Sequence, residues 1–250
     1  MISRDQLRQR IIEQTATISR FADENLVLDE SGALFWPKQN TLILSDLHFE
    51  KASFLNSFGH SLPELDTLDT LERLGNLISV YQPAKVVCLG DSFHDKNAWL
   101  RFPDKLKSIL LGLMNTVERW IWILGNHDPE IPDELPGECL SEYIIGDISL
   151  CHQPSPNLAA DIVGTRDKST LRNFLVFGHF HPKYKTARAR QNFSGKCFLL
   201  GDSFLVMPSF GSFTGGMWVS DEPLAPYYKK ATSVHLLMNA HILPMDLSAA

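Results

Sequence analysis

Short apolar runs alternate with amphipathic segments through the first half of the chain. Leucines recur at helical spacing over residues 63–81 and predict a helix with one apolar stripe that ends before Pro83. A second helix is predicted at residues 104–117. Apolar runs too short for helices predict buried strands at residues 41–44, 85–89 and 120–124. This alternation of strand and helix is typical of an α/β fold.

The second half of the chain is dominated by short apolar runs separated by turns. These runs predict strands at residues 143–145, 148–151, 174–177, 197–200, 203–207 and 217–220. The polar residues 166–173 predict either a short helix or a loop. Because strands prevail here, we expect two mixed sheets packed face to face, with helices on the outside.

Both ends of the chain carry elements outside this central region. Apolar residues at helical spacing predict a helix over residues 5–21, and turn residues predict a hairpin of residues 26–28 and 33–36. Residues 221–250 predict a further hairpin that turns at Asn239 and Ala240. No linker or repeat interrupts the sequence, so we expect one domain over residues 1–250 with its core at residues 26–220.

Charge and cysteine content narrow the class of protein. The formal net charge of −6 argues against a surface coated for tight, nonspecific nucleic-acid binding, but a bound metal pair can reverse the field locally. The four cysteines are far apart and mostly lie in apolar runs, which favours reduced core thiols. With a polar start and no run long enough to span a bilayer, we expect a soluble, cytoplasmic protein without a membrane partner.

Five short polar blocks each follow a predicted strand, at residues 45–48, 90–91, 125–128, 151–152 and 178–181. A single histidine in such a place is most often a hydrogen-bonded structural residue, and a single aspartate most often caps a helix. Five coincidences of this kind are hard to explain in one chain. Ligands of open α/β sheets gather at strand ends, so the set predicts one shared metal centre.

The order of these blocks resembles that of the calcineurin-like metallophosphoesterases, over residues 40–216. The resemblance implies the four-layer α/β sandwich of that family and a pair of metal ions bridged by Asp91. It also implies the remaining ligands: Asp46, His48 and His181 for one ion, and Asn126, His152 and His179 for the other.

The ligand set has chemical consequences. Imidazole nitrogens mixed with carboxylate and amide oxygens suit Mn²⁺, Fe²⁺ or Zn²⁺ better than Ca²⁺. Two such ions turn a bridging water into hydroxide at neutral pH and hold the phosphoryl oxygens for in-line attack. By resemblance, His127 lies beside the ions and donates a proton to the departing oxygen; the alternative is a structural residue behind the ligands.

One block departs from the common family pattern. Where many relatives have Gly-Asp-x-x-Asp, this chain has His94 in place of the second aspartate, which commonly orients the histidine corresponding to His127. Its orienting partner here is therefore open between His94, Asp95 and Asp128. His94 can equally be a loop residue that faces solvent.

Further segments resemble one branch of the family, the ligase-associated DNA-damage-response metallophosphoesterases of bacteria. They are residues 35–37, residues 46–52, the Gly-Asp-x-x-His block, and residues 205–211 leading to 214–216. Ser209 and Glu50 depart from the residues usual in that branch. The resemblance implies a Mn²⁺-dependent nuclease acting on DNA in repair, with a functional link to a DNA ligase and a helicase.

A basic stretch follows the last histidine block and includes Lys183, Lys185 and Arg188. On a strand Lys183 and Lys185 share one face, where they can line a path for a phosphate backbone; the alternative is a solvated edge hairpin whose charges protect it from pairing with another strand. Four aromatic residues near the predicted mouth can stack on bases or pack in the core: Phe49, Phe54, Phe58 and Phe93.

Two rival functions remain. One is the same chemistry on phosphomonoesters or nucleotides; a protein phosphatase is weakened because Gly-Asp-x-x-Asp-Arg-Gly is missing. The other is a noncatalytic scaffold with the same fold. The presence of His127 together with every expected ligand favours an enzyme.

Overall fold

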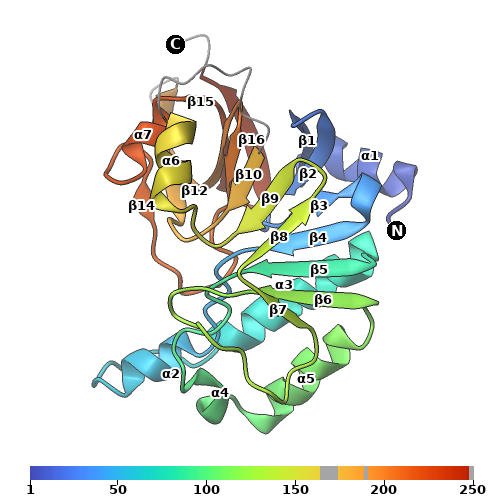
Figure 1. Cartoon of the computed structure of the whole chain (residues 1–250), viewed down its shortest axis with the longest axis vertical. Helices are drawn as coiled ribbons and strands as arrows, with labels where there is room; N and C mark the ends of the chain where they lie inside the picture. Colours follow the sequence, from blue (N-terminus) through green and yellow to red (C-terminus); the bar gives the residue numbers. More distant parts are fainter. Residues whose placement is uncertain (164–173, 189–190, 248–250) are drawn as a thin grey trace.

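Two β-sheets pack face to face and helices cover their outer sides (Figure 1). This arrangement is that of a computed structural model, which describes residues 1–163, 174–188 and 191–247. Three clusters of buried apolar side chains separate four layers: one beneath each helical layer and one between the sheets. The α/β sandwich predicted from the sequence is therefore confirmed.

The first sheet contains seven strands in chain order. They are β1 (Ala16–Phe21), β2 (Glu24–Asp29), β3 (Leu34–Trp36), β4 (Thr41–Leu44), β5 (Lys85–Leu89), β6 (Arg119–Ile123) and β7 (Glu138–Leu140). Pairs from β1 to β4 are antiparallel, and those from β4 to β7 are parallel. Leu42 and Leu44 pack toward the helices, whereas Ile43 packs toward the other sheet. Burial on both faces explains why these strands are continuous apolar runs.

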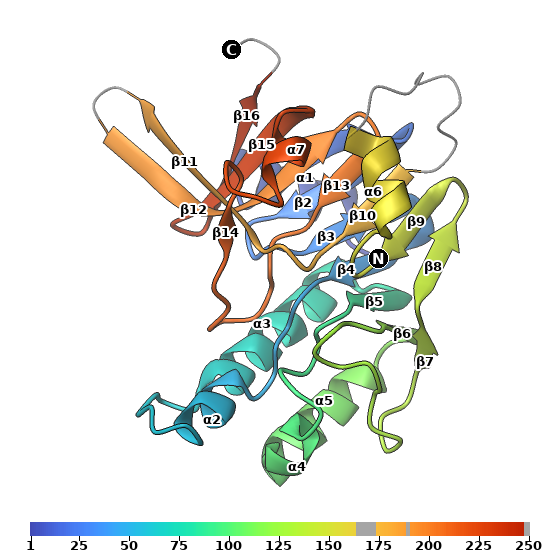
Figure 2. The ribbon, with the colours of Figure 1, turned by 60° about the vertical axis from the view of Figure 1, so that its left-hand side comes forward.

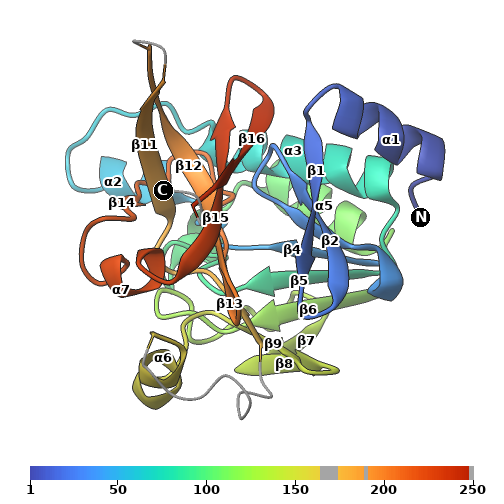
Figure 3. The same ribbon diagram turned by 90° about the horizontal axis from the view of Figure 1, so that it is seen from above.

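The second sheet contains nine strands among the described residues. They are β8 (Glu142–Ile145), β9 (Ile148–Cys151), β10 (Phe174–Phe177), β11 (Pro182–Arg188), β12 (Gln191–Gly201), β13 (Phe204–Val206), β14 (Met217–Trp218), β15 (Ala231–Met238) and β16 (His241–Asp246). β9, β10 and β13 are parallel neighbours. β11 and β12 form a long antiparallel pair that reaches beyond the rest of the sheet (Figures 2 and 3).

The helices vary from single turns to four turns. They are α1 (Arg4–Ile12), the 3₁₀ turn η1 (Pro37–Gln39), α2 (Lys51–Asn56), α3 (Asp66–Tyr81), α4 (Ala98–Arg101), α5 (Asp104–Met114), α6 (Pro156–Val163) and α7 (Ala225–Tyr228). α3 and α5 bury their apolar stripes against the first sheet, and α6 and α7 cover the second (Figure 2). None of the described helices is long and apolar enough to cross a membrane.

The N-terminal helix predicted over residues 5–21 is wrong in its second half. α1 ends at Ile12, and residues 16–21 form β1, which pairs with β2 along its whole length. Gln14, with φ of 58°, turns the chain between the two elements. Thr17 and Ile18 are β-branched and fit a half-exposed strand better than a helix, so local helical spacing loses to sheet pairing.

Most other predicted elements are confirmed. The strands at residues 41–44, 85–89, 148–151 and 174–177 have the predicted bounds, while the predicted helices are trimmed to residues 66–81 and 104–114. The hairpin at Asn239 and Ala240 joins β15 to β16, and both turn residues have positive φ, as a tight two-residue turn requires. β15 also pairs with β12, so this C-terminal hairpin is part of the second sheet. The segment 166–173 lies outside the described residues.

The topology brings the five polar blocks together. β4, β5 and β6 are parallel, so their carboxyl ends meet at one edge of the first sheet. β9 and β10 are parallel in the second sheet and end toward the same region (Figure 1). The backbone links the loops further: Asp46 N–H donates to Gly90 O at 3.2 Å and Gly178 N–H donates to His152 O at 3.0 Å.

Candidate metal centre

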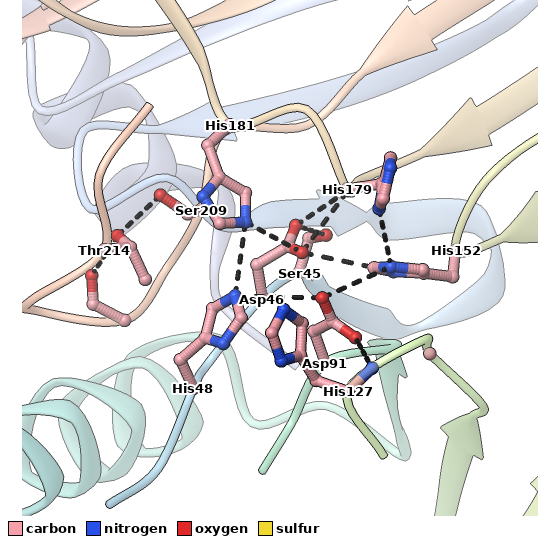
Figure 4. Close-up of polar contacts among 12 residues, drawn as sticks. Ser45, Asp46, His48, Asp91, His127, His152, His179, His181, Ser209 and Thr214 are labelled. Carbon is pink, nitrogen blue, oxygen red and sulfur yellow. Dashed lines mark hydrogen bonds and ion pairs between the residues drawn. The ribbon is translucent and has the colours of Figure 1, made fainter. Parts of the chain in front are cut away.

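Figure 4 shows side chains from all five polar blocks converging between the two sheets. Within the first group, one ligand atom each of Asp46, His48 and His181 lies within 4.8 Å of the others. Asp46 Oδ1 is 3.0 Å from His181 Nε2, which in turn is 3.3 Å from His48 Nε2. Asp46 is fully buried, and its Oδ2 accepts the backbone N–H of His179 at 3.0 Å. It therefore ties the first block to the last.

A second group lies beside the first. Asp91, His152 and His179 each place a ligand atom within 4.8 Å of the other two. His179 Nδ1 is 3.1 Å from His152 Nε2, and Asn126 Oδ1 is 3.0 Å from the same nitrogen. All seven residues expected to hold metal ions thus gather in these two groups or against them.

Asp91, a member of the second group, also faces the first. Its Oδ2 atom is 3.8 Å from His48 Nε2 on one side and 3.4 Å from His152 Nε2 on the other. Its Oδ1 atom accepts the backbone N–H of His127 at 2.9 Å, which holds the carboxylate in place. A carboxylate in this position can serve an ion in each group.

The donor atoms of the second group fit a cation. His152 Nδ1 donates to the carbonyl oxygen of Leu89 at 2.9 Å, so in the neutral ring Nε2 presents a lone pair. That lone pair faces oxygens of Asp91 and Asn126 and a nitrogen of His179. Burial opposes protonation of this ring, but the two nearby carboxylates raise the pKa of His152 to about 9. A divalent ion would supply the positive charge in place of that proton.

Asp46 is held in its charged form by the histidines around it. Burial by itself disfavours the carboxylate, but His181, His152 and His48 together hold the pKa of Asp46 well below its usual range. The result is a buried anion aimed at three imidazoles, which is the charge distribution that a metal site needs.

Backbone strain is concentrated on the same residues. Asp46, His48, Asp91, His179 and His181 all have φ between 47° and 69°, in the left-handed region. Non-glycine residues in this region carry a conformational cost and persist where the surroundings fix them, most often at functional sites. Gly90 is needed beside them, because a Cβ there would lie 2.5 Å from the His152 ring.

Asp128 organises the loops around Asp91. Its carboxylate accepts the backbone N–H groups of Asp91, Ser92, Phe93 and Gly125 at 2.6–3.1 Å. Burial raises the pKa of Asp128 to about 7, against the effect of these donors. Asp128 therefore positions the Gly90–Asp91 and Gly125–Asn126 turns, and within the described part of the chain its carboxylate hydrogen bonds go to backbone N–H groups rather than to the His127 ring.

The ring of His127 is oriented by a main-chain group. Its Nδ1 donates to the carbonyl oxygen of His94 at 2.9 Å. The His94 ring is buried and stacks on the His127 ring at 5.2 Å between centroids, so it is not the solvent-facing residue that the sequence left open. Asp95 is occupied by a salt bridge with Arg101. A backbone carbonyl leaves no trace in a sequence pattern, and this partner was therefore missed.

Residues 209–214 form a supporting loop next to His181, inside a segment that the sequence singled out by resemblance and not for its contacts. Lys196 Nζ donates to Ser209 O, Gly211 O and Thr214 Oγ1 at 2.8–2.9 Å. The same loop donates backbone N–H groups to Ser45 O and Asp46 O and lies beside His181 (Figure 4). Burial lowers the pKa of Lys196 to about 8. Lys196 thus belongs to the support of the site.

The residues expected to bind substrate are the basic residues of β11 and four aromatic residues. Lys183 and Lys185 lie on one face of β11, as their spacing predicts, whereas the side chain of Arg188 is outside the described part of the structure. Of the four aromatic residues, Phe49 and Phe93 are buried in the core. Phe54 packs on the His94 ring at 4.7 Å, and Phe58 is 71% exposed.

Solved structures similar to this chain include a nuclease and a phosphoesterase. A Pseudomonas putida nuclease, MPE, matches with a TM-score of 0.68 and 22% identity, over 92% of this chain and 100% of the other. A phosphoesterase from E. coli, Yfce, matches with a TM-score of 0.41 and 16% identity, over 83% of this chain and 98% of its own. The first likeness bears on the fold alone, and the second is too distant to carry an argument. No curated protein sequence matches the chain.

The family itself is established from the sequence. The family model for calcineurin-like phosphoesterases matches residues 40–243, which include every block of the candidate centre. Two adjacent groups of potential metal ligands accompany that match. The chain belongs to the calcineurin-like phosphoesterase family, and with it to the metal-dependent phosphoester hydrolases.

Proposed function

We propose that this protein is a phosphodiesterase that cleaves nucleic acid with two divalent metal ions, Mn²⁺ being the preferred metal. The observation that carries the proposal is the position of Asp91. Its Oδ2 atom lies 3.4 Å from His152 Nε2 in one ligand group and 3.8 Å from His48 Nε2 in the other. Two ions that share a carboxylate supply a hydroxide nucleophile and neutralise the charge that develops on the phosphoryl oxygens.

Each residue has a role in the proposal. Asp91 would contribute to both ions, Asp46, His48 and His181 would hold one, and Asn126, His152 and His179 would hold the other. The backbone carbonyls that accept N–H groups from ligand loops keep these side chains in place before substrate arrives.

His127 is the proposed proton donor. With Nδ1–H donating to the His94 carbonyl, the imidazolium form presents its second proton on Nε2. The Oδ1 atom of Asp91 holds the backbone of His127 beside the carboxylate that would contact both ions, so the ring lies close to the ligand groups without belonging to either. That is the place for a group that protonates the departing oxygen.

Nucleic acid is the proposed substrate class. A nuclease is among the structures that share this fold over nearly the whole chain. Lys183 and Lys185 follow the ligand His181 on β11, and they offer cations to a phosphate backbone. The resemblance to the ligase-associated repair branch supports a role on DNA in the cytoplasm, with a functional link to a DNA ligase and a helicase.

The deciding experiment compares a diester with a monoester. We expect hydrolysis of bis-p-nitrophenyl phosphate to exceed that of p-nitrophenyl phosphate with added Mn²⁺, and chelation or Asp91→Ala to abolish it. Exposed Asp133→Ala is the matched control and should retain activity. Faster monoester hydrolysis would favour the phosphomonoesterase alternative. No hydrolysis of either ester with Mn²⁺, Fe²⁺ or Zn²⁺ would favour the noncatalytic scaffold.

A further inference from the structure

One face of the β11–β12 hairpin combines cations with an indole ring. Lys183 pairs with Trp218 of β14 in the parallel register, so the two side chains share a face of the sheet. The ammonium nitrogens of Lys183 and Lys185 lie 4.6 and 5.0 Å from the centroid of the Trp218 ring. Two cations therefore surround one aromatic ring.

This face is partly exposed to solvent: Lys185 is exposed, and Lys183 and Trp218 are half-buried. Trp218 lines a surface hollow of about 510 Å³ together with Lys185, and exposed Asn192 and Ser194 lie on its β12 side. The opposite face is turned inward, because Tyr184 packs on Tyr228 against the apolar cluster of the second sheet. The alternation of β11 thus separates a basic, aromatic outer face from a half-buried face that packs on the second apolar layer.

The same face continues from the metal centre. Met217 N–H donates to His181 O at 3.1 Å, which joins β14 to the last ligand. The backbone at Gly216 packs closely against both His181 and Lys183. A Cβ there would lie 2.5 Å from His181 O and 2.6 Å from Lys183 Cδ. At about 3.3 Å per residue along a strand, Lys183 and Lys185 lie about 7 and 13 Å beyond His181. These steps suit successive phosphates of an extended strand.

We propose that Trp218 is a stacking platform for a base of single-stranded nucleic acid, whose phosphates run past Lys183 and Lys185 toward the metal centre. This rests on the proposed function and specifies its substrate. Single-strand binders combine a basic path with aromatic rings on which unpaired bases stack. Bases in a duplex are already stacked on each other, so an indole ring that takes up an unpaired base, with its two lysines turned to the phosphates, distinguishes the two forms. Because the protein as a whole has a net charge of −6, Lys183 and Lys185 attract phosphates locally and are not part of a generally basic surface.

Binding of labelled oligonucleotides by fluorescence anisotropy tests the platform. The background is His127→Ala with Mn²⁺, so that the strand is not consumed, and the ligands are oligo(dT), an abasic strand of equal length and a duplex. Trp218→Ala should weaken oligo(dT) binding by about tenfold, since one stacked base contributes about 1–3 kcal/mol. Trp218→Phe, which keeps an aromatic face, should stay close to the parent. Abasic-strand affinity should change little with either variant.

Three outcomes would overturn the platform: equal weakening of oligo(dT) and abasic strands by Trp218→Ala, no weakening of either, or tighter binding of duplex than of oligo(dT). The first would leave only an electrostatic contribution, and the second would remove the contact. Ester hydrolysis is measured separately on the otherwise unsubstituted protein. Its absence would contradict the proposed function, whereas the anisotropy ratios would still decide the platform.

Discussion

The Nδ1 atom of His127 lies 2.9 Å from the main-chain carbonyl oxygen of His94. A carbonyl oxygen can only accept a hydrogen bond, so Nδ1 must be the nitrogen that carries the proton. Nε2 is then free to exchange a proton with the substrate. The stacked ring of His94 limits rotation of the His127 ring from the other side. The orientation of the His127 ring therefore depends on both the backbone carbonyl and the side chain of His94.

Replacement of His127 should separate rate from metal binding. We expect His127→Ala to lower kcat for the diester by about 10²- to 10⁴-fold, the usual contribution of general acid–base catalysis, while Mn²⁺ binding stays close to the parent. Isothermal titration of Mn²⁺ and steady-state kinetics check the two parts. Unchanged turnover would eliminate the proton-donor role.

His94→Ala is the informative companion, because it keeps the carbonyl and removes the ring. We expect a loss of kcat smaller than that of His127→Ala, since the hydrogen bond to Nδ1 survives. Because His94 Nδ1 also lies 3.2 Å from Nδ1 of the ligand His48, Mn²⁺ binding is measured too; a loss of kcat as large as that of His127→Ala with unchanged Mn²⁺ affinity would mean that the stacked ring, and not the carbonyl, controls the orientation. The comparison uses the same diester assay.

Asp128→Asn should disturb the centre without touching a ligand side chain. An amide cannot accept four N–H groups as the carboxylate does, and its own NH₂ would face backbone donors. We expect Mn²⁺ affinity to fall by about 10- to 100-fold, as for other groups that position ligands. Unfolding in urea should show a loss of about 2 kcal/mol. The control Asp133→Asn changes an exposed acid nearby and should leave both quantities alone.

The sequence predicted the centre because its chemistry is carried by side chains at the ends of apolar runs. β4, β5, β9 and β10 are marked by buried residues on both faces, so their ends, and the histidines and aspartates that follow, stand out. Sheet pairing then brings the blocks together. Their roles as ligands stay a prediction until metal binding is measured.

Other features could not be predicted because they depend on backbone groups or on distant pairing. Asp128 binds four main-chain N–H groups, and no side-chain pattern records them. β1 forms where helical spacing suggested a helix, because β2 offers it a complete set of strand contacts. Trp218 meets Lys183 only because β14 pairs with β11 across more than thirty residues.

Removal of two lysines should alter the salt dependence of nucleic-acid binding. Each phosphate contact contributes about 0.7 to the slope of log K against log salt for a single strand, so Lys183→Ala with Lys185→Ala should reduce its magnitude by about 1.4. Lys229→Ala with Lys230→Ala makes the same charge change on exposed residues after α7 and should keep the parent slope. Equal slopes in all three proteins would contradict a phosphate path on β11.

Charge reversal at the same two positions gives a second reading. Lys183→Glu with Lys185→Glu should slow cleavage of a polynucleotide far more than that of bis-p-nitrophenyl phosphate, because only the polymer extends along β11 from the centre. Equal loss on both substrates would mean that the change disturbs the metal centre itself. Rates at saturating Mn²⁺ make the comparison.

His235 should make the fold less stable in mild acid. It is buried on β15, its Nε2 contacts Ser19 and Ser233 hydroxyls, and its Nδ1 has no hydrogen-bond partner among the described residues. Burial lowers its pKa to about 4, below the value of about 6.5 in the unfolded chain. The unfolded state therefore takes up the proton first, and stability falls as pH drops from about 6.5 to about 4, by about 2 kcal/mol at pH ~5. Urea unfolding at about pH 6.5 and about pH 5, with His235→Gln as control, isolates this contribution. An equal change in the free energy of unfolding between these pH values in the variant would contradict it.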